Sequence, residues 1–62
     1  MQGKLYVVRW LQHGSTACEE RFPNLEDAKR HAMEQIKLNR ALGVATSALV
    51  CDDTGEQFMQ VF

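Results

Sequence analysis

Few residues of this chain have types and spacings that could support catalysis. The tripeptide Asp-Thr-Gly at 53–55 matches the catalytic tripeptide of aspartic proteases. Those enzymes bring two such aspartates together, so that one shared proton divides the acid and base roles. Here the tripeptide stands between two short β-rich runs, where Asp and Gly favour a turn, and the chain is too short for a substrate cleft and flaps. We therefore interpret 53–55 as part of a turn.

The other residues with reactive or metal-binding side chains are Cys18, Cys51, His13 and His31. No two of them have the Cys-x-x-Cys or His-x-x-x-His spacing that would place two metal ligands on one element. Cys18 follows His13 across a turn, but no third group that would orient a thiol–imidazole pair is indicated. A disulfide would require Cys18 and Cys51 to lie on neighbouring strands. We expect two reduced thiols, no metal, no cofactor and no enzymatic activity.

Composition and length limit the class of protein. The 62 residues suffice for one small domain (1–62), with 45% hydrophobic residues and 24% charged residues. A net charge of −1 provides no general attraction to nucleic acids or acidic membranes. The first residues lack the apolar core of a signal peptide, and no apolar run approaches the ~20 residues of a membrane span. We expect a cytoplasmic protein that does not enter membranes.

One long segment has the apolar spacing of an α-helix. Asn24 is the predicted N-cap, and Gly43 follows the last periodic residue, where a left-handed conformation favours glycine. The small side chain of Ala32, in the middle of the apolar stripe, would let the helix approach a sheet closely. The predicted stripe consists of Leu25, Ala28, Ala32, Met33, Ile36 and Leu42.

The runs on either side of this helix are rich in β-branched and aromatic residues, which favour strands. They predict four strands, at 4–12, 16–22, 45–51 and 56–62. Glycines at 14 and 55 mark turns within the two pairs. The first strand is apolar on both sides and is expected to be central, whereas charges in the second favour an edge position. The predicted fold is α+β with the order ββαββ: a four-stranded, mainly antiparallel sheet with one helix packed on one face.

Two segments resemble known families. The helix opening Phe-Pro-Asn-Leu-Glu-Asp-Ala at 22–28 follows an aromatic and valine-rich strand and an acidic second strand. The closing hairpin reads Val-Cys-Asp-Asp-Thr-Gly-Glu-Gln-Phe at 50–58. This pattern is similar to several families of short uncharacterised bacterial proteins. The resemblance implies the ββαββ fold, and it implies no functional site because no activity is assigned to those families.

More side chains are apolar than one helix can cover. Both sides of the first strand and both sides of the last strand carry apolar residues, and an exposed apolar sheet face on a small protein usually marks a partner site. We therefore predict a non-enzymatic protein–protein interaction module. Its expected partner is a second copy (a homodimer), bound through the open sheet face or an edge strand, or another protein. The predicted interface residues are Leu5, Val7, Arg9, Leu11, Phe58 and Phe62.

Two alternatives use other features of the chain. A single-stranded nucleic acid could be bound by basic residues on one flank of the helix together with an aromatic residue of the sheet. The residues for this alternative are Lys29, Lys37, Arg40 and Trp10. Glu26 and Glu34 interrupt the basic flank, and nucleic-acid-binding domains usually carry a basic excess. The second alternative, a phage-type inhibitor of a host protein, follows from the similar size of such inhibitors alone.

Overall fold

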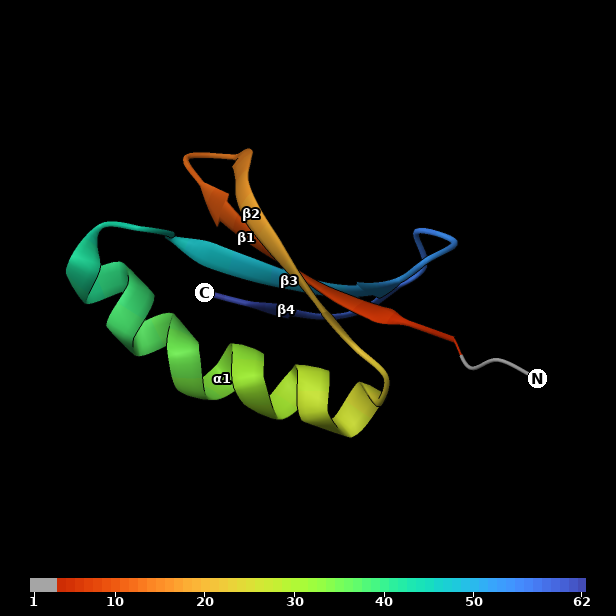
Figure 1. Ribbon diagram of the computed structural model, residues 1–62. Helices are drawn as coiled ribbons and strands as arrows, with labels where there is room; N and C mark the ends of the chain where they lie inside the picture. The colour runs from red at the N-terminus through yellow and green to blue at the C-terminus, as the bar shows by residue number, and fades with distance from the viewer. Residues whose placement is uncertain (1–3) are drawn as a thin grey trace.

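The computed structural model describes residues 4–62. Four strands and one helix follow one another in the order ββαββ, and the antiparallel strands form one open sheet with the spatial order β2-β1-β3-β4. Helix α1 crosses one face of this sheet (Figure 1). The predicted α+β fold is confirmed. The elements are β1 (Tyr6–Gln12), β2 (Ser15–Phe22), α1 (Leu25–Leu42), β3 (Ser47–Asp52) and β4 (Gln57–Val61).

Both ends of α1 are set by local hydrogen bonds. Asn24 has an extended backbone, and its Oδ1 accepts hydrogen bonds from the amides of Glu26 (2.8 Å) and Asp27 (3.3 Å). At the other end, Gly43 adopts the left-handed conformation (φ 74°) and its amide donates to the carbonyl of Arg40. The predicted start and end of the helix are therefore confirmed. Within the described part of the chain, no helix is both long and apolar enough to cross a membrane.

The first hairpin turns at His13 and Gly14, whose φ angles are both positive (53° and 84°). Two consecutive positive φ angles are typical of the hairpin turn that matches the twist of the strands. Strand β1 pairs with β2 on one side and β3 on the other, so it is central, as predicted. Strand β2 is an edge strand with almost entirely exposed residues.

The hydrophobic core lies between α1 and the sheet. Ala28 and Ala32 are fully buried, so the helix backbone comes close to the strands, and Trp10 fills the space beside them. Buried residues of this cluster are Val8, Trp10, Ala28, Ala32, Ile36, Ala45, Ala48 and Val50.

The predicted apolar stripe of the helix was too wide. Met33 is 52% exposed and Leu42 is 65% exposed. Met33 is next to Ala32 in sequence, which places it about 100° around the helix, on a flank rather than toward the sheet. Leu42 belongs to the last turn of α1, which extends past the start of β3 (Figure 1). The sheet offers no surface at either position.

Candidate interaction surfaces

Alternate side chains of β1 point to opposite faces of the sheet. Val8 and Trp10 belong to the core beneath α1, so the odd-numbered side chains face the opposite side. Among residues 4–62, no element covers that side, which we call the open face. Four of the predicted interface residues share it: Leu5, Val7, Arg9 and Leu11.

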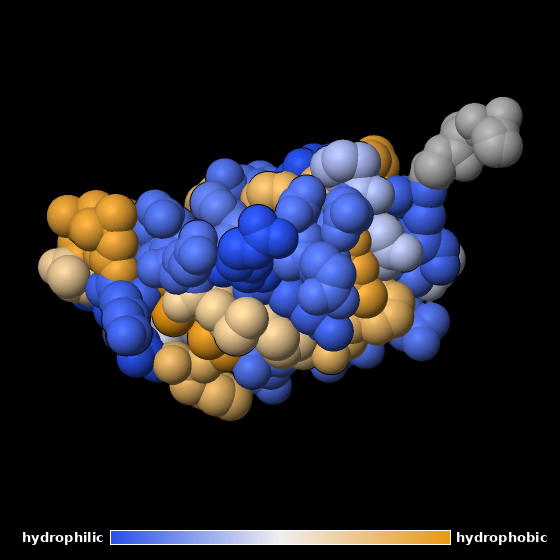
Figure 2. Space-filling model, turned by 90° about the horizontal axis from the view of Figure 1, so that it is seen from below, coloured by the Kyte–Doolittle hydropathy of each residue, from blue (hydrophilic) through white to orange (hydrophobic). Residues whose placement is uncertain are grey.

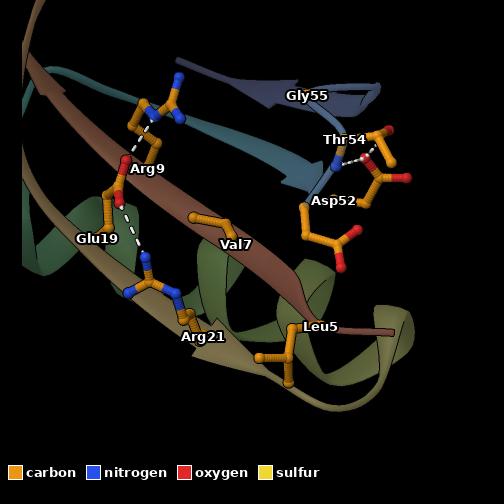
Figure 3. A pocket seen from close by; sticks show the side chains of 9 residues that line it. Leu5, Val7, Arg9, Glu19, Arg21, Asp52, Thr54 and Gly55 are labelled. Atoms are coloured by element: carbon orange, nitrogen blue, oxygen red, sulfur yellow. Dashed lines mark hydrogen bonds and ion pairs between the residues drawn. The ribbon is translucent and has the colours of Figure 1, made fainter. Parts of the chain in front are cut away.

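The open face contains a hollow of about 400 Å³ (Figure 3). Leu5 and Val7 supply its apolar surface, and the turn between β3 and β4 (52–55) forms one wall. The opposite wall consists of three charged side chains, Arg9, Glu19 and Arg21. Leu11 does not line the hollow, so the structure brings together three of the four predicted residues of this face.

Glu19 lies between the two arginines of the hollow (Figure 3). Arg9 Nε donates a hydrogen bond to Glu19 Oε2 (2.8 Å), and Arg21 Nη2 lies 3.6 Å from Glu19 Oε1. Arg9 and Glu19 are direct partners in the antiparallel register, which explains why they meet. Glu19 and Arg21 were not among the residues predicted from the sequence, because their position opposite β1 depends on this register. One carboxylate facing two guanidinium groups leaves one positive charge in excess.

The turn wall is organised by Asp52, whose side chain is fully buried. Its Oδ1 accepts hydrogen bonds from the Thr54 hydroxyl (2.6 Å), the Thr54 amide (2.9 Å) and the Glu56 amide (3.0 Å), and its Oδ2 lies 3.3 Å from Lys4 Nζ. These hydrogen bonds lower the pKa of Asp52 to about 2, and the bond from the Thr54 hydroxyl has the largest effect. The two amides and Lys4 add to it, whereas burial acts in the opposite direction. Residues 53–55 thus form a turn, as predicted. The sequence signal for this role of Asp52 is the Thr two residues later, because an Asp side chain can accept hydrogen bonds from groups two residues further along the chain.

Trp10 is not available to bind nucleic acid. Its side chain is 1% exposed beneath α1, and its Nε1 donates to Glu20 Oε1 (2.8 Å). The prediction that Trp10 stacks on bases was wrong because the even-numbered residues of β1 face the helix. His31 Nε2 also lies 2.8 Å from Glu20 Oε1. Burial alone would raise the pKa of Glu20, but the bonds from Trp10 and His31 together lower it.

The other three predicted nucleic-acid contacts lie on α1. Lys29 is half-buried, and Lys37 and Arg40 are exposed. Arg40 Nε is also 3.4 Å from the carbonyl oxygen of Thr46, the residue before β3. These three cations therefore share a flank of α1. Trp10, the aromatic residue predicted to act with them, is buried and does not offer a surface on which a base could stack.

The flank of α1 with Met33 is directed toward β4. His31 contacts Glu20 and the ring of Phe22, so the flank of α1 that carries His31 faces β2. Met33 lies about 200° around the helix from His31, and β4 is the edge of the sheet opposite β2. Figure 2 shows a continuous apolar band along this side of the molecule. We use the name β4 surface for the exposed and partly exposed apolar residues of β4, of the residue that follows it and of this helix flank: Met33, Phe58, Met59, Val61 and Phe62.

The two remaining predicted interface residues belong to the β4 surface. Phe58 is the extra residue of a β-bulge, and its ring packs against Tyr6 at a centroid distance of 5.9 Å. Phe62 follows the end of β4 and is 71% exposed. The predicted interface is therefore divided: the residues of β1 lie on the open face, and the two phenylalanines lie at the β4 edge.

The two edges of the sheet differ in charge. Edge strand β2 carries Glu19, Glu20 and Arg21, and charged side chains discourage pairing with a foreign strand. Residues 57–62, by contrast, include no charged side chain. Nothing between residues 4 and 62 pairs with the outer edge of β4. Strand β4 is therefore the edge that is better suited to accept another strand.

The thiols are separated by a strand. Cys18 on β2 is exposed and pairs with Trp10, whereas Cys51 on β3 is buried and pairs with Val7. Both are free, as predicted. Over residues 4–62, no three side chains of His, Cys, Asp or Glu are grouped closely enough to hold a metal ion.

Comparison with known proteins provides no relative. No protein-family model, no curated protein and no solved structure matches this chain.

Proposed function

We propose that this protein is a non-enzymatic protein–protein interaction module that forms a homodimer through β4. The observation that carries this proposal is the combination of an uncharged edge strand with exposed apolar side chains beside it, the β4 surface. Unpaired N–H and C=O groups along an edge strand can bind a further strand, and neighbouring apolar side chains add burial.

A second copy supplies a suitable strand. Two β4 strands related by a two-fold axis would pair antiparallel, and the same residues would contact each other from both sides. Met33 (52% exposed) and Phe62 (71% exposed) of each copy would then lose contact with water. A 62-residue domain buries a smaller share of its surface on folding than a larger domain does, so association would add stability that increases with protein concentration.

The open face supports dimerisation less well. Its central apolar side chain, Val7, is already 93% covered by the protein's own neighbours, since only 7% is exposed. Burying Arg9, Glu19 and Arg21 in an interface would remove water from three charges, which costs free energy unless each one is paired again.

Sedimentation equilibrium at micromolar concentration tests the proposal. The wild type should show a mass near twice 7.1 kDa. Phe62→Lys should shift it to the monomer, because it replaces an exposed apolar side chain of the β4 surface with a charge that would have to lose water in the interface. Leu42→Lys is the matched control, since Leu42 is similarly exposed (65%) but belongs to the end of α1, away from β4. A monomeric wild type, or equal dissociation by both variants, would contradict the proposal.

A separate measurement addresses the nucleic-acid alternative. Contacts with phosphates release counterions, so binding through Lys29, Lys37 and Arg40 would weaken steeply with salt. We expect no binding of single-stranded DNA or RNA at physiological salt, because Trp10 is buried and the chain is slightly acidic. Tight binding that is lost in Lys37→Glu and at high salt would instead favour that function.

A further inference from the structure

The hollow on the open face has a chemistry that dimerisation through β4 does not use. It is formed within one chain, with apolar Leu5 and Val7 between a basic wall and a turn (Figure 3). Its volume of about 400 Å³ is within the range of small-ligand sites.

The basic wall retains capacity for an anion. Glu19 uses one oxygen for each arginine, so two guanidinium charges are balanced by one carboxylate. Arg9 donates to Glu19 through Nε alone, and among residues 4–62 its terminal nitrogens have no acceptor. Guanidinium groups bind carboxylates and phosphates through paired N–H donors.

The turn wall limits the charge of the anion. The charge of Asp52 is offset by Lys4, whose Nζ lies 3.3 Å away. Asp53 also lines the hollow, and its negative charge repels an anion, about twice as strongly when the anion carries two charges instead of one. A singly charged carboxylate therefore fits this site better than a dianionic phosphate.

We propose that the hollow binds a carboxylate attached to an apolar body. The carboxylate binds Arg9 and Arg21, and the apolar body packs mainly on Leu5, which is 43% exposed, and on the small part of Val7 that remains exposed (7%). Two sources share this chemistry: the C-terminus of a polypeptide that ends in an apolar residue, and a free small apolar acid.

NMR titration of the ¹⁵N-labelled protein with N-acetyl-leucine tests the site. We expect saturable shifts of the Val7 and Arg9 amides and of the Arg21 side-chain N–H, with little effect of N-acetyl-leucinamide, which lacks the charge. Arg21→Gln should weaken binding about fivefold, as expected for a solvent-exposed charged hydrogen bond. Glu19→Gln should strengthen it, because the competing carboxylate is removed. Both residues are exposed, so the spectra should show that both variants remain folded.

The outcomes separate clearly. Equal shifts with the amide, equal affinity for inorganic phosphate, or absence of saturable shifts in both wild type and Glu19→Gln would overturn the proposal. If Glu19→Gln reduced the affinity for N-acetyl-leucine as much as Arg21→Gln does, the proposal would also be overturned. A peptide with a C-terminal leucine that binds more tightly than N-acetyl-leucine would assign the source as a polypeptide, and equal binding would assign a free acid. Because the titration reports on the open face, failure here leaves the β4 dimer unaffected.

Discussion

The carboxylate of Glu20 lies 2.8 Å from the indole nitrogen of Trp10. This hydrogen bond connects edge strand β2 to the largest fully buried side chain of the core. The same oxygen lies 2.8 Å from His31 Nε2, so one side chain joins two strands and the helix. An acidic residue on an otherwise solvent-facing strand therefore has a structural role.

Removing this carboxylate should destabilise the fold. Glu20→Ala leaves the buried N–H of Trp10 without an acceptor and should lower the free energy of unfolding by about 1–2 kcal/mol. Glu19→Ala, the neighbouring control, removes only solvent-exposed ion pairs and should cost less than about 0.5 kcal/mol. Urea unfolding followed by the fluorescence of Trp10, the single tryptophan, measures both. Equal costs would show that the Trp10 bond contributes nothing.

Stability should fall in acid because of Asp52. Its pKa is about 2 in the folded protein, below the ordinary value of 3.8, so the unfolded chain binds the proton first. The stabilisation from ionised Asp52 is thus complete above about pH 5 and is lost progressively, mostly as the pH falls from about 4 to about 2. Melting temperatures of the wild type should decrease across this window.

The variant Asp52→Asn provides the control for this window. It keeps an acceptor oxygen for the turn but removes the titrating proton and the charge paired with Lys4. We expect lower stability than the wild type at pH 7 and a flatter pH dependence between pH 4 and 2. An unchanged acid slope would assign the acid sensitivity to other carboxylates, such as Glu20, whose pKa is also lowered.

The close approach of helix and sheet makes Ala32 sensitive to substitution. Ala32 is fully buried, so Ala32→Glu would place a carboxylate in the core without a partner and should cost several kcal/mol. Glu34→Ala changes an exposed position and should cost less than about 0.5 kcal/mol. Thermal melts compare the two. If Ala32→Glu had the melting temperature of the wild type and Glu34→Ala had a much lower one, the helix would face the other way.

Local interactions explain what the sequence alone predicted. Asn24 caps the helix through amides two and three residues away, and Gly43 ends it through a backbone conformation of its own. The turn at His13 and Gly14 is equally local. Because each of these depends on a few consecutive residues, the element order ββαββ could be predicted without knowledge of the packing.

The division of surfaces was decided by the tertiary structure. Both sides of β1 are apolar, so the sequence did not distinguish the side of Val7 from the side of Trp10; the helix covers the latter because it packs with Val50 and Ala48 of β3. Because the helix packs on that side, Trp10 is buried and Arg9 lies on the open face. The meeting of Arg9 with Glu19, and the separation of Phe58 from Val7, depend on strand register and a bulge. These relationships join residues far apart in the chain, and no local propensity specifies them.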